Sequence, residues 1–129
     1  MIPQYTQAGL LNEMRVLASP ATVDNTPTCG NQEDYVAMGY FACRKAGMAA
    51  EKLEYILAIE LLSDYQAQQF QDRDTEVSSV SKNIYETLGK QIPVMEKDML
   101  LYPHIEYLRE LIHSGTVLKL AEDIAGKLK

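Results

Sequence analysis

The fold of this chain is decided by a stretch near its middle, Leu53-Glu54-Tyr55-Ile56-Leu57-Ala58-Ile59-Glu60-Leu61-Leu62. On a helix, these residues place apolar side chains on nearly every face, and helices of that kind are buried on all sides. No proline occurs between Asp34 and Gln71, so the stretch is predicted to lie inside one long helix over that range, capped by Asn31 or Asp34.

The length of this helix limits what can cover it. A helix of ~35 residues is roughly 50 Å long. A chain of 129 residues is one domain's worth, and a compact domain of that size is only about 36 Å across. The apolar middle of the helix is therefore expected to bury against other copies of the chain, or against a missing part of the same protein.

The rest of the chain is also predicted to be helical, because no alternation of polar and apolar residues persists anywhere in it. Further helices are expected over 4–17, 79–90, 103–113 and 117–127, with Pro103 in a first turn and Thr116 as a cap. A turn-rich connection over 18–30 separates the first helix from the long one. The prediction is an all-α fold, a helical bundle with one very long central helix, over a single helical region 1–129.

Composition and charge narrow the function classes. A net charge of -6 lacks the basic field that nucleic acid or an anionic membrane surface requires, so neither is an expected partner. Cys29 and Cys43 form neither a disulfide framework nor a metal motif, and such thiols suit the reducing cytosol. His104 and His113 lack metal-ligand spacing, so no metal is expected. No segment resembles a signal peptide or a membrane span, which predicts a soluble, cytoplasmic protein.

The segment Asn31-Gln32-Glu33-Asp34 is the one candidate for chemistry. Four polar residues at a junction between a loop and a helix can serve as a cap, because Asn and Asp accept hydrogen bonds from free backbone N–H groups. The same residues at a loop tip could instead present a carboxylate and an amide to a pocket. The residues alone favour the capping interpretation.

A longer stretch of sequence around these four residues favours the functional interpretation. The passage from Ala18-Ser19-Pro20-Ala21-Thr22-Val23-Asp24 through Pro27-Thr28 to Asn31-Gln32-Glu33-Asp34-Tyr35-Val36-Ala37-Met38-Gly39 resembles histidine ammonia-lyases in order, spacing and residue type. Residues 57–62 resemble the central-bundle helix of these enzymes. The C-terminal end of these enzymes resembles residues 96–98 and 103–106. The opening residues 1–6 resemble an internal stretch. The chain thus resembles the C-terminal part of an aromatic amino acid ammonia-lyase, most like histidine ammonia-lyase.

The resemblance implies a function and a site. Enzymes of this family use a methylidene-imidazolone formed from an internal Ala-Ser-Gly, and they remove ammonia from a small amino acid to give an arylacrylate such as urocanate. They are tetramers with long helices in a central bundle and active sites shared between subunits. Glu33 matches an active-site glutamate that contacts substrate or takes part in proton transfer, so Glu33 is the expected catalytic residue, and Gln32 and Glu33 are the expected substrate-binding residues. Tyr35 and Ala37 stand where histidine enzymes commonly have His and Ser, which leaves the substrate open.

The prosthetic group is not expected in this chain. The nearest match to Ala-Ser-Gly is Ala18-Ser19-Pro20, and cyclisation needs a third residue whose backbone nitrogen can lose a proton, which proline cannot. The chain is therefore predicted to be inactive alone and to work with the missing N-terminal part or in a homo-oligomer. Two alternatives stay open: a helical oligomerisation or interaction module without catalysis, and a fragment of an aminomutase.

Overall fold

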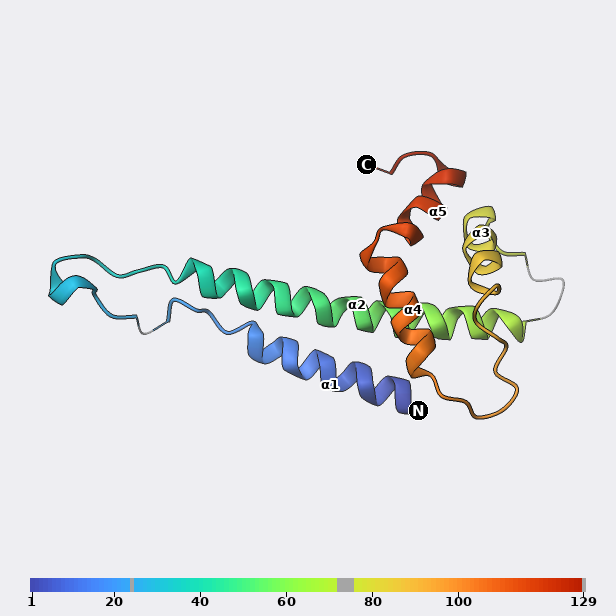
Figure 1. The fold of residues 1–129 in the computed structure, drawn as a ribbon, viewed down its shortest axis with the longest axis horizontal. Coiled ribbons are helices and arrows are strands. Elements are labelled where there is room, and N and C mark those ends of the chain that lie inside the picture. Colours follow the sequence, from blue (N-terminus) through green and yellow to red (C-terminus); the bar gives the residue numbers. More distant parts are fainter. Residues whose placement is uncertain (24, 72–75, 129) are drawn as a thin grey trace. The chain divides into compact units, whose positions relative to one another are not determined.

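The computed structural model describes residues 1–23, 25–71 and 76–128, and within them its regular structure is helical. The elements in order are α1 (Ile2–Leu17), the 3-10 turn η1 (Cys29–Asn31), α2 (Gly39–Gln69), α3 (Ser79–Leu88), α4 (Tyr102–His113) and α5 (Thr116–Ala125) (Figure 1). The predicted all-α fold is confirmed. The chain divides into two compact units, Met1–Leu53 and Glu54–Lys129, and the division falls within α2.

The long helix is present, but its predicted start was wrong. It begins at Gly39 rather than Asp34, because Tyr35 pairs with Pro27 in an isolated antiparallel bridge and Met38 has a left-handed backbone with φ 52°. Asn31 and Asp34 therefore do not cap this helix: Asn31 ends η1, and Asp34 lies between the two elements. Even so, α2 has 31 residues and is about 46 Å long.

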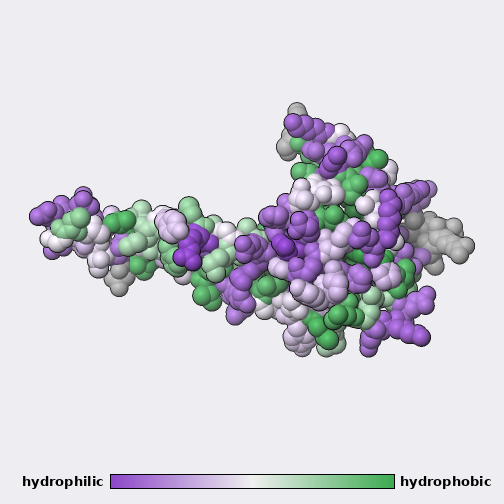
Figure 2. Space-filling model, viewed as in Figure 1, coloured by the Kyte–Doolittle hydropathy of each residue, from purple (hydrophilic) through white to green (hydrophobic). Residues whose placement is uncertain are grey.

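In the first unit, α1 runs antiparallel to the first part of α2 (Figure 1). The Lys52 ammonium pairs with the Glu13 carboxylate, and nearer the loop the Lys45 ammonium donates to the backbone carbonyl of Ser19. No side chain of α1 is buried. Hydrophobic residues therefore remain on the surface of this unit (Figure 2).

The second unit contains the core. Ala58 and Leu62 of α2 pack with Leu88 at the end of α3, with Ile92 beyond it and with Leu108 of α4. Helix α5 contacts α3 and α4. Burial of a leucine-sized side chain contributes about 1.5–3 kcal/mol, so this cluster is the main source of stability in the unit.

Hydrogen bonds at the edge of the same core hold the segment that follows α3. The buried Tyr65 donates its hydroxyl to the carbonyl of Ile92 at 3.0 Å. The buried Gln66 amide donates to the carbonyl of Pro93 at 2.8 Å and accepts from the N–H of Met95 at 2.9 Å. Because unpaired polar groups are costly to bury, these bonds hold the segment after α3 in one place.

The single chain covers the apolar surface of α2 only in part, as its length predicted. Ala58, Ile59 and Leu62 are buried, whereas Leu53 is 44% exposed and Leu57 is 39% exposed. Nearer the start of the helix, Tyr40 and Phe41 are exposed as well. The described part of the chain thus leaves apolar surface on α2 uncovered. None of the described helices is long and apolar enough to cross a membrane.

The ends of α4 and α5 follow from local chemistry. Pro103 lies in the first turn of α4, as predicted. Thr116 does not cap α5: it is the first helical residue, and Gly115, with φ 74°, occupies the cap. Glycine adopts this left-handed conformation without steric cost, so the turn between the helices can be tight. The Asn83 side chain then ties α3 to α5 by donating to the carbonyl of Leu120 at 2.8 Å.

A group of charged side chains links α2 to α4 in the second unit. Glu54 lies 2.8 Å from Nδ1 of His113 and 3.4 Å from Nη1 of Arg109. The Tyr55 hydroxyl donates to Glu106 at 2.7 Å, and the Arg109 guanidinium lies over the Tyr55 ring. The hydrogen bond with His113 lowers the pKa of Glu54 below its ordinary 4.5, and the same bond raises the pKa of His113 above its ordinary 6.5.

These two shifts predict where in pH the pair stabilises the fold. The raised pKa of His113 adds to the free energy of unfolding; this addition is complete below pH 6.5 and is lost as the pH rises through the pKa of the folded state. The lowered pKa of Glu54 also adds to the free energy of unfolding; this addition is present above pH 4.5 and is lost on acidification. We expect His113→Gln to lower the urea midpoint at pH 5.5 and to have little effect at pH 9. An equal effect at both pH values would show that the ion pair is not its cause.

Candidate functional site

The candidate site lies on the loop between α1 and α2, whose two arms are tied to each other. Pro27 and Tyr35 form an antiparallel bridge. Next to it, the Asn25 side-chain amide donates to the carbonyl of Val36, and the N–H of Thr26 donates to the Asn25 side-chain oxygen at 2.8 Å. A loop tied in this way presents its tip in a defined position, as binding and catalytic loops do.

The tip is a left-handed turn. Cys29, Gly30 and Asn31 have φ values of 52°, 62° and 70°. A left-handed backbone costs roughly 1–2 kcal/mol for most residues but little for glycine, and asparagine tolerates it. The strain is therefore concentrated at Cys29, and the tied arms on either side hold the turn in place. Strained backbone of this kind is frequent at functional sites.

Glu33 follows this turn. Its N–H donates to the carbonyl of Thr28 at 3.4 Å, and its carboxylate accepts from the Thr28 hydroxyl at 3.2 Å. The side chain is exposed, and among the described residues no cation pairs with it. The geometry thus gives an oriented carboxylate with room to accept a proton or to meet a positive group.

The other predicted residues lie on the same loop. The N–H of Gln32 donates to the carbonyl of Cys29 at 3.2 Å, and its side chain is exposed. Tyr35 and Ala37, with Thr22, Asn25 and Val36, line an open hollow of about 530 Å³. The two positions at which the resemblance leads us to expect His and Ser therefore both border this hollow. Asp24, also in the matching passage, lies outside the described residues.

Ser19 does not fit the formation of a methylidene-imidazolone. Its hydroxyl donates to the carbonyl of Val16 at 3.0 Å, and Lys45 donates to its carbonyl and, at 3.1 Å, to its hydroxyl. The next residue is Pro20, whose tertiary nitrogen cannot complete the ring. In the described ranges, no cluster of three or more His, Cys, Asp or Glu side chains could hold a metal ion.

Two residues that hold the loop in place were not predicted from the sequence. Thr28 orients Glu33, and the sequence signal for it is weak: a hydroxyl five residues before a carboxylate. Lys45 holds the start of the loop, although it lies 26 positions away from Ser19. Both contacts depend on the loop folding back on itself, which local sequence does not encode.

Comparison with known proteins finds a matching family model and relatives that align over the whole chain. A family model described as aromatic amino acid lyase matches residues 1–90. The chain is 41% identical over 129 residues to histidine ammonia-lyase 2 of Fusobacterium nucleatum and 40% identical over 129 residues to histidine ammonia-lyase of Symbiobacterium thermophilum. In each case the match covers 100% of this chain and 25% of the relative.

A solved structure agrees with the sequence relatives. The chain superposes on the crystal structure of histidine ammonia-lyase from Trypanosoma cruzi with a TM-score of 0.87 and 32% identity. This match covers 95% of the chain and 24% of that structure. The chain therefore spans about a quarter of the length of the proteins it matches.

The left-handed tip predicts opposite effects of one substitution at two glycines. Gly30→Ala places a Cβ where φ is 62° and should lower the free energy of unfolding by about 1 kcal/mol. The matched control, Gly47→Ala, lies within α2 with no atom in the way and should raise that free energy by roughly 0.5–1 kcal/mol. Urea unfolding measures both, and destabilisation of similar size in both variants would contradict the left-handed turn.

Proposed function

The chain belongs to the aromatic amino acid lyase family, and on that premise we propose that it supplies the glutamate-bearing loop of a histidine ammonia-lyase active site completed by other polypeptide. One observation carries the proposal: Glu33 stands beyond a tied, strained turn, held by Thr28. The family resemblance implies that the histidine enzymes have an active-site glutamate at this position. Gln32, beside it, is the second proposed contact to the substrate.

The chemistry suits a carboxylate. Non-oxidative deamination breaks a C–H bond at the β-carbon, forms the Cα–Cβ double bond and releases ammonia from the α-carbon. Glu33 can accept the β-proton, or its charge can balance the ammonium or imidazolium of the substrate. The Thr28 hydroxyl fixes the orientation of the carboxylate, and orientation of a reacting group is a large part of catalysis.

The activity belongs to a larger protein. This chain has no Ala-Ser-Gly, and Ser19 is unsuited to the same chemistry, so the electrophile must come from polypeptide outside these residues. Histidine is the proposed substrate because a carboxylate at residue 33 suits a basic, imidazole-bearing amino acid. The hollow bordered by Tyr35 and Ala37 is the place at which a substrate side chain other than imidazole would fit.

The uncovered apolar residues of α2 support a second part of the proposal, which concerns assembly with other protein. We assign α2 to the core of a homo-oligomer, or to an interface with the rest of the same enzyme. Each leucine-sized side chain buried there would contribute about 1.5–3 kcal/mol, and Leu53, Leu57, Tyr40 and Phe41 are all exposed in the single chain. Cys29 and Cys43 are free and exposed, which suits a cytoplasmic location.

A second candidate function rests on the missing electrophile. Without a partner that carries Ala-Ser-Gly, the chain would act as a helical oligomerisation or interaction module. An aminomutase fragment is the alternative within the enzyme class, since such an enzyme returns ammonia to the β-carbon. Whether free ammonia and urocanate, or a β-amino acid, appear in the completed enzyme distinguishes lyase from mutase.

The test combines the chain with a polypeptide that carries Ala-Ser-Gly and represents the rest of a histidine ammonia-lyase. We expect no urocanate, measured by its ultraviolet absorbance, from the chain alone, and urocanate from the combination. In the combined enzyme, Glu33→Gln should lower kcat by about 10²–10⁴-fold, the range for removing a general acid or base.

Asp34→Asn is the matched control, because it neutralises the neighbouring carboxylate on the same loop. We expect this variant to keep kcat within about threefold of the unsubstituted enzyme. Urocanate from the chain alone, or equal losses in the Glu33 and Asp34 variants, would contradict the proposal. Assembly without any lyase activity would favour the non-catalytic module.

A further inference from the structure

A buried lysine lies at the base of the loop that carries Glu33. Lys45, in the second turn of α2, is only 8% exposed, which is unusual for a residue type that is almost never fully buried without a partner. Its ammonium donates to the carbonyl of Ser19 and, at 3.1 Å, to the hydroxyl of Ser19. The Phe41 ring lies one turn away on the same helix, 5.8 Å from the ammonium.

The position of Ser19 explains why a cation is favoured there. Ser19 follows Ala18, the C-terminal cap of α1, and the C-terminus of a helix carries a partial negative charge on its free carbonyl groups. A lysine at this place neutralises that charge and satisfies a carbonyl. The Phe41 ring adds a cation–π attraction on another side of the ammonium.

We propose that Lys45 is a positioning residue, which fixes the base of the loop over 19–38 and thereby sets where the carboxylate of Glu33 lies. Lys45 joins the end of α1 to the start of α2, the two elements from which the loop emerges. With that base fixed, the ties from Asn25 to Val36 and from Thr28 to Glu33 carry the constraint to the tip. The part that Lys45 plays in catalysis rests on the proposed function; its anchoring of the loop does not.

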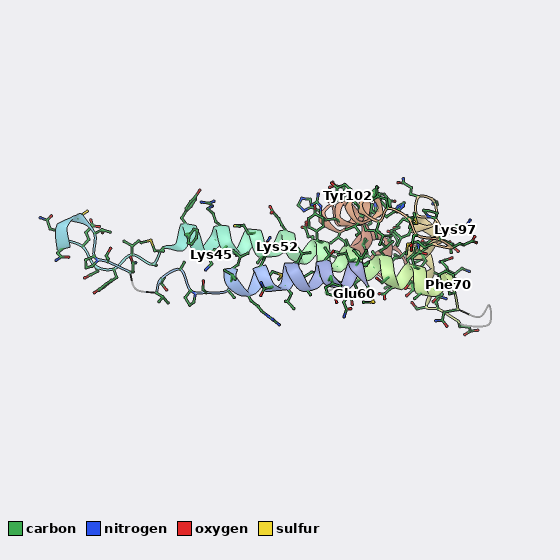
Figure 3. All side chains as sticks on the ribbon, turned by 90° about the horizontal axis from the view of Figure 1, so that it is seen from below. Lys45, Lys52, Glu60, Phe70, Lys97 and Tyr102 are labelled. Carbon is green, nitrogen blue, oxygen red and sulfur yellow. The ribbon has the colours of Figure 1, made fainter. Side chains whose placement is uncertain are left out.

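Lys52 offers a matched control. It also joins α2 to α1, through the Glu13 carboxylate, but it lies two turns further from the loop, and its side chain is more exposed. Both lysines extend from the side of α2 toward α1 (Figure 3). A change that weakens the pairing of the helices in general should therefore appear in both variants, whereas loss of the loop's anchor should appear in only one.

The first measurement is hydrogen exchange on the 129-residue chain in its own assembly state, followed by mass spectrometry of peptides that span 25–36. Lys45→Met keeps the aliphatic stem and removes the charged donor. We expect exchange in these peptides to accelerate about tenfold or more, the effect of losing a charge-assisted hydrogen bond. Lys45→Arg should restore protection, because the guanidinium still donates, and Lys52→Met should leave these peptides unchanged.

The second measurement uses the completed enzyme and a double-mutant cycle. Lys45→Met should lower kcat/KM about tenfold in the unsubstituted enzyme and cause no further loss in the Glu33→Gln background, because Lys45 acts through Glu33. A role in general stability would lower activity by the same factor in both backgrounds. Far-ultraviolet circular dichroism verifies that each variant keeps its helices.

The outcomes separate the inference from the proposed function. Unchanged exchange in Lys45→Met, or equal acceleration in Lys52→Met, overturns the anchor, whatever the activity. Accelerated exchange in Lys45→Met alone supports the anchor even if the combined enzyme shows no lyase activity, a result that would overturn the proposed function instead. Equal losses in the two kinetic backgrounds would overturn the coupling to Glu33.

Discussion

The rest of this structure depends on one constraint: α2 is a helix of 31 residues with more apolar surface than the described residues cover. Its C-terminal half is covered in part, since Ala58 and Leu62 pack with the core of the second unit while Leu57 stays exposed. Its N-terminal half is accompanied by α1, which buries none of its own side chains. Large exposed apolar patches mark surfaces at which other molecules bind. The chain's fit to about a quarter of the length of its relatives agrees with the presence of such a surface.

The antiparallel pairing of α1 with the start of α2 positions the loop that carries the candidate site. Two neighbouring helix ends give the loop a fixed base, and a fixed base permits a tied loop with a strained, left-handed tip. The tip would be costly in a free peptide, because Cys29 adopts a conformation that glycine favours. Held by the arms on either side, it presents Glu33 to solvent with a hydroxyl at one of its oxygens. In the proposed function, the same rigid support presents this carboxylate to the substrate.

Local sequence predicted much of this fold, and its failures have physical causes. Proline-free apolar periodicity predicted the long helix, and Pro103 located the first turn of α4. The start of α2 was misplaced, because the bridge between Pro27 and Tyr35 and the left-handed Met38 override the helical preference of residues 34–38. Gly115 rather than Thr116 caps α5, because the short turn from α4 needs a positive φ. Glu33 was predicted through family resemblance and stays a prediction, whereas Thr28 and Lys45 make contacts that only the folded loop brings together. That 1–129 forms a single helical region stays a prediction.

We propose that α2 requires cover from outside this chain, and sedimentation equilibrium of the purified 129-residue protein tests this requirement most directly. We expect a mass well above 14.5 kDa that falls with dilution, because exposed apolar side chains on α2 associate. Leu57→Glu, a change at an exposed position of this helix, should shift the equilibrium toward the single chain. A monodisperse species of 14.5 kDa with native helix content, unchanged across a wide range of concentration, would contradict the account.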